Sequence, residues 1–126
     1  MPEANDHAGV AIVDDEVCLI RAYELLFKRR QIPIAFTAYD GMEAIEKFKK
    51  SNPKPKVVII DYRLTDMNGL DVMGEILAME PKTHIIFISG DDSILRESMA
   101  AGAVFMKKPT PIKEITDTIN ALMNDQ

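Results

Sequence analysis

The sequence is poor in cysteine and in aromatic residues, and these shortages exclude several classes of protein. Its single cysteine, Cys18, cannot form an internal disulfide and leaves a zinc site built on several cysteines short of ligands. There is no tryptophan, and only 5 phenylalanines and 3 tyrosines are available to stack on nucleic acid bases. With 20 acidic against 15 basic residues, the chain carries a net charge of -5. We therefore expect that this chain alone does not bind nucleic acid.

Long apolar segments are absent as well. No uninterrupted apolar run approaches the roughly 18 residues that span a bilayer. The first residues, MPEANDHAG, have neither the basic nor the apolar region of a signal peptide. We therefore predict no membrane association and a cytoplasmic location. The 126 residues, 47% of them hydrophobic, fit one domain, which we expect at residues 9–126 after a disordered polar tail at residues 1–8.

Short apolar runs alternate with segments of helical spacing. Runs rich in β-branched residues predict strands buried on both faces at 10–13, 57–60 and 85–88, and weaker runs predict edge or shortened strands at 33–38 and 103–106. Apolar residues at helical spacing follow the runs, for example at 16–30 and 70–79. A capping box at Asp40–Glu43 predicts a further helix start, and Thr110 is expected to cap a last helix with Pro111 at its first position. The alternation predicts an α/β fold with a parallel sheet covered by helices on both faces.

The residues that follow the predicted strands carry most of the candidate chemistry. In an open α/β sheet, ligands bind beyond the carboxyl ends of the strands. These ends are marked by polar groups, namely Asp14-Asp15, Asp61, Ser89 and Lys107-Lys108. Each group taken alone is explained by helix capping, a turn or a solvated surface. Together they predict a single polar site at one edge of the sheet.

Three carboxylates at one edge of a sheet need a compensating charge. At an effective dielectric near 20, a close pair of like charges repels by about 4 kcal/mol. A bound cation removes this repulsion, and Mg²⁺ fits because it takes hard oxygen ligands and completes its shell with water and phosphate oxygens. A carboxylate beside Mg²⁺, a lysine and a hydroxyl is also a plausible phosphoryl acceptor, since aspartate forms aspartyl phosphates.

Four segments in this order resemble the motifs of the receiver domain of two-component response regulators. They are Val10–Glu16 (VAIVDDE), Asp61–Gly69 (DYRLTDMNG), Ser89-Gly90 and Lys108-Pro109. The resemblance covers nearly the whole chain. It implies a flavodoxin-like (βα)5 fold with strand order 2-1-3-4-5. It also implies a signalling module that takes phosphoryl from a histidine kinase or a histidine phosphotransfer protein, and that catalyses only its own phosphorylation and slow dephosphorylation.

The resemblance also implies a role for each acidic residue of the predicted site. Asp61 is expected to be the phosphoacceptor and to contact Mg²⁺. Asp15 is expected to bind the metal directly and Asp14 mainly through water, with the backbone carbonyl of Arg63 as another ligand.

Further expectations concern the phosphoryl group and the response to it. Ser89 and Lys108 are expected to bind the phosphoryl group, with a Lys108-Pro109 bond that is often cis in such domains. Phe105 is expected to change rotamer together with Ser89. The response is expected on the surface of the fourth helix, fifth strand and fifth helix, which would bind a downstream protein or a second copy. The segment from Ser89 to Lys108 is shorter than usual, which predicts a trimmed fourth helix or following turn.

Two more residues are expected to modulate the lifetime of the phosphoryl group. Arg63 and Asp91 are the second residues after Asp61 and Ser89, and they are expected to flank the path of hydrolytic water. Their opposite charges allow them to pair across that path.

Two other functions compete with the receiver hypothesis. A phosphatase of the haloacid dehalogenase type also uses a strand-end aspartate and Mg²⁺, but it normally has a second aspartate where this sequence has Arg63. A receiver-like binding module that never uses its phosphate site is disfavoured because all the expected residues are present.

Overall fold

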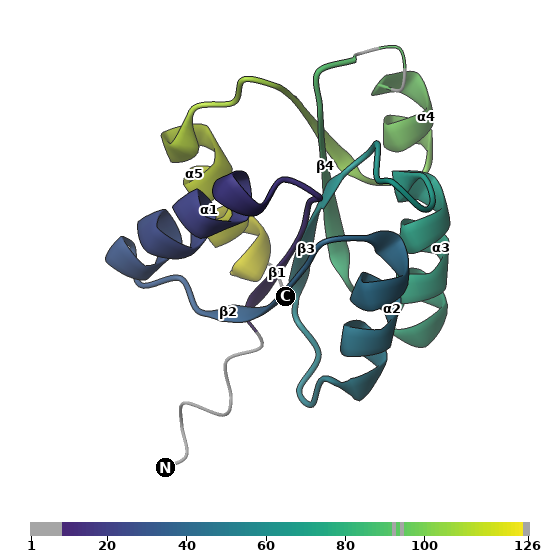
Figure 1. The fold of residues 1–126 in the computed structure, drawn as a ribbon, viewed down its shortest axis with the longest axis horizontal. Coiled ribbons are helices and arrows are strands. Elements are labelled where there is room, and N and C mark those ends of the chain that lie inside the picture. The colour runs from purple at the N-terminus through teal and green to yellow at the C-terminus, as the bar shows by residue number, and fades with distance from the viewer. Residues whose placement is uncertain (1–8, 92, 94, 125–126) are drawn as a thin grey trace.

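Five strands alternate with five helices along the part of the chain that the structure describes (Figure 1). The computed structural model describes residues 9–91, 93 and 95–124, so the expected tail at 1–8 lies outside the described residues. The strands are β1 (Val10–Val13), β2 (Ile34–Ala38), β3 (Val57–Asp61), β4 (His84–Ser89) and β5 (Val104–Lys107). The helices are α1 (Val17–Arg29), α2 (Gly41–Lys50), α3 (Gly69–Met79), α4 (Leu95–Ala100) and α5 (Ile112–Met123).

The strands form one parallel sheet in the order β2-β1-β3-β4-β5. This is the flavodoxin-like order that the resemblance implied, and the predicted strands are confirmed. β1, β3 and all of β4 after His84 are buried, whereas β2, at one edge of the sheet, is mostly half-buried. The order places β1 and β3 side by side, so their carboxyl ends meet at the centre of one sheet edge.

Helices cover both faces of the sheet (Figure 1). On one face, the apolar sides of α1 and α5, including Phe27 and Ile119, pack on β-strand residues such as Ile12. On the other face, α2 and α3 bury Phe48 and Ile76 against the sheet. Because residues alternate between the two faces along a strand, the same strands supply both cores.

α2 begins where the sequence predicted a helix start. Asp40 is the N-cap, and its side chain accepts a hydrogen bond from the Glu43 N–H at 2.8 Å. The Glu43 carboxylate reaches one residue further back than in a standard capping box and accepts from the Tyr39 N–H at 2.7 Å.

The start of α5 differs from the expectation. The helix begins at Ile112 with Pro111 as its N-cap, so the prediction that Thr110 caps this helix was wrong by one residue. The Thr110 hydroxyl instead donates to the Lys107 carbonyl at 2.7 Å. It therefore stabilises the turn that leaves β5, and the Pro111 side chain has no hydrogen-bonding group with which to cap the helix.

The shortened segment before β5 is accommodated by a short helix. α4 spans 6 residues, against 10 to 13 in each of the other helices described. This agrees with the prediction of a trimmed fourth helix. None of the helices in the described part of the chain is both long enough and apolar enough to cross a membrane.

Candidate functional site

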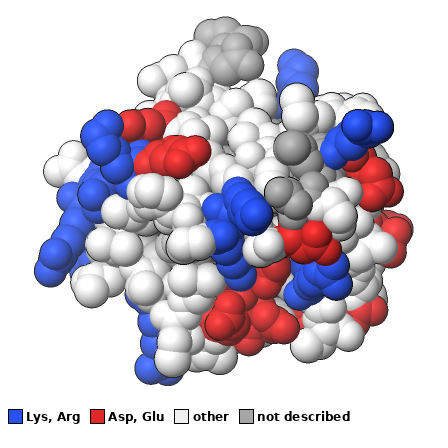
Figure 2. All heavy atoms as spheres, turned by 90° about the horizontal axis from the view of Figure 1, so that it is seen from above, with Lys and Arg blue, Asp and Glu red and all other residues white. Residues whose placement is uncertain are grey.

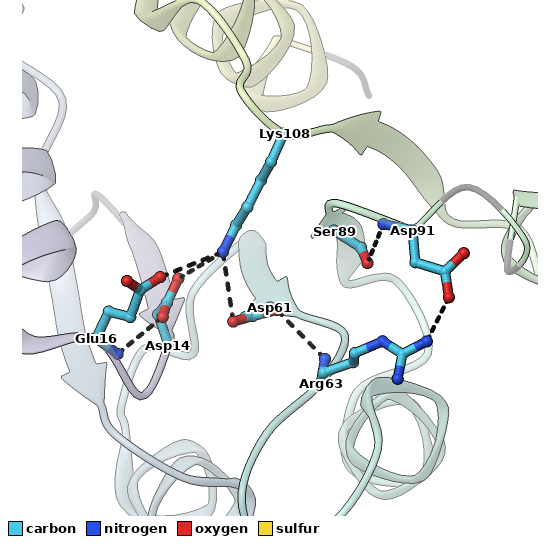
Figure 3. Close-up of polar contacts among 7 residues, drawn as sticks. All are labelled: Asp14, Glu16, Asp61, Arg63, Ser89, Asp91 and Lys108. Carbon is cyan, nitrogen blue, oxygen red and sulfur yellow. Dashed lines mark hydrogen bonds and ion pairs between the residues drawn. The ribbon is translucent and has the colours of Figure 1, made fainter.

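The polar residues predicted from the strand ends lie at one edge of the sheet (Figure 3). Asp14 directly follows β1, Asp61 ends β3 and Ser89 ends β4, while Lys108 follows β5. The Lys108-Pro109 peptide bond is cis, as the resemblance implied. Figure 2 looks onto this edge and shows a compact group of acidic side chains with basic side chains next to it.

Three carboxylates form a compact acidic cluster. One oxygen of each of Asp14, Asp15 and Asp61 lies within 4.8 Å of the others. Asp14 is 4% exposed and Asp61 is 9% exposed. Burial raises the pKa of Asp14 to about 6, and the neighbouring charge of Asp61 adds to this effect, although the Glu16 N–H acts against it. Burial also raises the pKa of Asp61, against the opposing effects of Lys108 and the Arg63 N–H.

Lys108 reaches into this cluster from the β5–α5 loop (Figure 3). Its amino nitrogen lies 3.5 Å from Asp61 Oδ2, 3.8 Å from Asp14 Oδ2 and 3.6 Å from Glu16 Oε1. Burial lowers the pKa of Lys108, but the three carboxylates outweigh this effect and raise it above its usual value. Sequence reasoning missed the contact with Glu16, although this residue directly follows the predicted acidic pair.

The acidic cluster fits a divalent cation. The Lys108 ammonium faces the carboxylates of both Asp14 and Asp61, so one positive charge is shared between at least two negative ones. All three side chains of the cluster offer carboxylate oxygens, the ligands that Mg²⁺ prefers. The residues present therefore suit Mg²⁺.

Ser89 belongs to a second group of contacts beside the cluster (Figure 3). Its hydroxyl oxygen accepts a hydrogen bond from the Asp91 N–H at 3.1 Å. The Asp91 carboxylate in turn pairs with the Arg63 guanidinium, which joins the loop after β3 to the loop after β4. The Arg63 N–H donates to Asp61 Oδ1 at 3.2 Å, so these contacts extend to the centre of the cluster.

Phe105 lies on the same face of the sheet as Ser89. It is half-buried and packs against the core under α2 and α3. In the register of β4 and β5, Phe105 pairs with Phe87 and Lys107 pairs with Ser89. Ser89 and Phe105 therefore lie on adjacent parallel strands, on the same face of the sheet and two residues apart in register.

The comparisons with known proteins agree with this geometry. The profile of the response regulator receiver domain matches residues 10–120. Chemotaxis protein CheY of Thermotoga maritima is 32% identical over 114 residues, which make up 88% of this chain and 93% of that protein. The probable transcriptional regulatory protein TcrX of Mycobacterium tuberculosis is 29% identical, over 90% of this chain but only 49% of its own length.

Solved structures show the same fold. A chain of the CheX-CheY-BeF3-Mg²⁺ complex from Borrelia burgdorferi is 26% identical and gives a TM-score of 0.82, over 92% of this chain and 89% of that one. A receiver domain protein from Clostridium thermocellum gives a TM-score of 0.84 at 24% identity, over 93% of this chain and 94% of that one.

These matches favour the receiver hypothesis over a phosphatase of the haloacid dehalogenase type. Receiver domains are signalling modules and not classical enzymes. Because both the receiver profile and the CheY relative extend over most of the chain, this protein belongs to the receiver domain family of two-component response regulators.

Proposed function

We propose that this receiver domain accepts a phosphoryl group on Asp61 with the help of Mg²⁺. The donor is a histidine kinase or a histidine phosphotransfer protein. The observation that carries the proposal is the position of the Asp61 carboxylate, which ends the central strand β3 in contact with the Lys108 ammonium and within the same cluster as the Asp14 and Asp15 carboxylates.

The transfer itself is a displacement at phosphorus. An oxygen of Asp61 attacks the phosphorus of a phosphohistidine, an O–P bond forms and the N–P bond breaks, and its electron pair remains on the imidazole nitrogen. Lys108, 3.5 Å from Asp61 Oδ2, is placed to neutralise charge on the transferring group. The Ser89 hydroxyl oxygen accepts a hydrogen bond from the Asp91 N–H. Its own O–H therefore remains able to donate a hydrogen bond to a phosphoryl oxygen.

The metal is assigned to the acidic cluster. Asp15 and Asp61 would bind Mg²⁺ directly, Asp14 mainly through water, and the Arg63 carbonyl would complete the protein ligands. Mg²⁺ when bound supplies positive charge that offsets the charge of the phosphoryl group. The protein side chains hold the acceptor oxygen and the lysine in place around it.

The response to phosphorylation is assigned to the surface of α4, β5 and α5. A phosphoryl group that draws in the Ser89 hydroxyl vacates space near Phe105, and the ring then favours an inward rotamer. The phosphoryl group shifts this equilibrium only by its different interaction with the two arrangements. A downstream protein or a second copy of the domain would bind the altered surface.

The proposal is tested with acetyl phosphate and intact mass spectrometry. Incubation with Mg²⁺ is expected to add one phosphoryl group, and an excess of chelator is expected to prevent the addition. The metal dependence follows because the buried carboxylates otherwise repel an incoming phosphate. Asp15→Ala is expected to slow the addition more than Asp14→Ala. Undiminished labelling in chelator would contradict the role of the metal.

Phosphorylation is expected to change the conformation of β5 through Lys108 and not through its neighbour Lys107. Lys108 contacts Asp61, whereas Lys107 is exposed. Amide chemical shifts with and without beryllofluoride, a phosphoryl mimic, measure the response. Lys108→Ala is expected to lose the shifts at Phe105, and Lys107→Ala, the matched control, to retain them. The reverse result would show that the active-site lysine has been misassigned by one residue.

The pair between Arg63 and Asp91 is expected to slow hydrolysis of the phosphoryl group. Both side chains are exposed to solvent, which screens their attraction, so the pair contributes little. Replacing both by alanine is therefore expected to speed decay by no more than roughly fivefold. The decay is followed by intact mass after removal of acetyl phosphate, with Thr65→Ala in the same loop as control. An unchanged rate would show that the pair does not restrict water.

A further inference from the structure

The N-terminus of α2 is capped by a side chain from a distant loop. Asp66, in the β3–α3 loop, accepts a hydrogen bond from the Gly41 N–H at 2.8 Å with one carboxylate oxygen. Its other oxygen accepts from the Met42 N–H at 2.9 Å. Asp40 caps the next amide, that of Glu43. The first three amides of α2 are therefore satisfied, and two of them depend on a residue outside the helix and its own cap.

A side-chain contact reinforces this connection. A Cβ atom added at Gly41 would lie 2.3 Å from Met67 Cγ and 2.5 Å from Met67 Sδ. The Met67 side chain therefore occupies the space that any larger residue at position 41 would need. Adjacent residues of the loop, Asp66 and Met67, thus hold the start of α2 through polar and apolar contacts.

The loop that makes these contacts is the one that begins at Asp61. Its stem is closed by a bridge between Arg63 and Asn68 and by a hydrogen bond from the Gly69 N–H to the Tyr62 carbonyl at 2.8 Å. At its start, the Arg63 N–H donates to Asp61 Oδ1. A short loop closed in this way transmits a displacement at one end to the other, because its backbone has few independent motions.

We propose that Asp66 is a positioning residue that couples the phosphoacceptor loop to the start of α2, so that metal and phosphoryl binding at Asp61 changes the conformation of residues 39–44. The proposal rests on the proposed function of the site. It assigns a response to a part of the molecule distinct from the surface of α4, β5 and α5. Tyr39 and Met42, which are 40% and 63% exposed, lie in this part, so the change reaches an apolar surface.

The test follows the amide signal of Ala44 by NMR on addition of Mg²⁺ and beryllofluoride. Ala44 donates to the Asp40 carbonyl and has no hydrogen bond to Asp66, so its signal reports on the helix and not on the removed contact. We expect it to shift in the wild type and the shift to be lost in Asp66→Ala. Asp66→Asn keeps one acceptor oxygen and is expected to retain part of the shift. It provides the test if the alanine variant fails to fold.

A second readout is the affinity for Mg²⁺. Loss of a direct hydrogen bond to a metal ligand typically weakens metal binding tenfold or more, and Asp66 acts one step further away. We therefore expect Asp66→Ala to raise the Kd for Mg²⁺ by about threefold. Asp40→Ala is the matched control, because it removes a cap from the same helix end without touching the loop. It is expected to keep both the Ala44 shift and the Mg²⁺ affinity.

The possible outcomes separate this inference from the proposed function. An Ala44 shift of equal size in Asp66→Ala and wild type would overturn the inference, and so would a wild type in which Asp61, Ser89 and Lys108 respond but Ala44 does not. In both cases the proposed function would stand. If no amide near Asp61 responds to beryllofluoride, the proposed function fails and the inference fails with it.

Discussion

Asp61→Asn is expected to abolish phosphoryl uptake from acetyl phosphate completely. The carboxamide has nearly the shape of the carboxylate and still offers an oxygen to the Arg63 N–H, so the loop contact at 3.2 Å is retained. It lacks the negative charge that makes the Asp61 oxygen nucleophilic, and covalent transfer requires that charge. Intact mass after incubation with Mg²⁺ measures the result. The fold should be preserved, as judged by thermal unfolding.

Asp91→Asn is the matched control for this loss. Asp91 lies at the same edge of the sheet, but its carboxylate pairs with Arg63, whereas the Lys108 ammonium contacts Asp61. This variant is expected to take up one phosphoryl group on Asp61, with at most the modestly faster decay that follows from loss of the Arg63 pair. Full labelling of Asp61→Asn, mapped by peptide mass to another residue, would show that the acceptor has been misassigned.

The sequence predicted the strands and the convergence of their ends well, for a physical reason. Buried parallel strands favour unbroken β-branched runs, as in the first four residues of β3, and such runs have few alternative explanations. Once the alternation is recognised, the carboxyl ends must share one edge. The places of Asp14, Asp61 and Lys108 therefore followed from the residues and their order before any contact was known.

Contacts between loops were much harder to predict. Nothing local to Asp66 indicates that it accepts hydrogen bonds from Gly41 and Met42, because the partners are separated by 25 and 24 residues. The Glu16 contact with Lys108 likewise depends on how two loops approach. The error at Thr110 is local: α5 begins one residue later than expected, at Ile112, so the Thr110 hydroxyl lies outside the cap position and donates to the Lys107 carbonyl in the turn after β5.

The acidic cluster implies a conflict between stability and metal binding. Asp14 and Asp61 are both buried, and their positions beside one another raise the free energy of the folded state whenever both are ionised without a metal. A protein that needed only a stable fold would be improved by replacing one of them with a neutral residue. Retaining both is consistent with a site whose purpose is to bind a cation.

Asp14→Asn is therefore expected to stabilise the protein in the presence of chelator at neutral pH. Burial raises the pKa of Asp14 from 3.8 to about 6. A carboxyl whose pKa is raised on folding costs no stability below its unfolded pKa. The cost grows as the pH rises from the unfolded pKa to the folded pKa and is complete above the folded pKa. The gain in the free energy of unfolding from Asp14→Asn should thus be small at pH 4 and complete above pH 7. The full rise in pKa corresponds to about 3 kcal/mol, and screening by nearby solvent reduces the expected gain to about 2 kcal/mol, or roughly 6–8 °C in Tm.

Asparagine is the informative replacement because Asp14 Oδ1 accepts a hydrogen bond from the Glu16 N–H at 2.9 Å, and the amide oxygen preserves this bond. Thermal unfolding across this pH range measures the effect, with Asp15→Asn, a more exposed member of the same cluster, as a control with a smaller expected gain. Saturating Mg²⁺ should reduce the advantage, because the metal stabilises the wild type more than a variant that has lost a carboxylate. A variant that is less stable than wild type in chelator at pH 8 would mean that Asp14 serves mainly to order the turn before α1 and not to bind a cation.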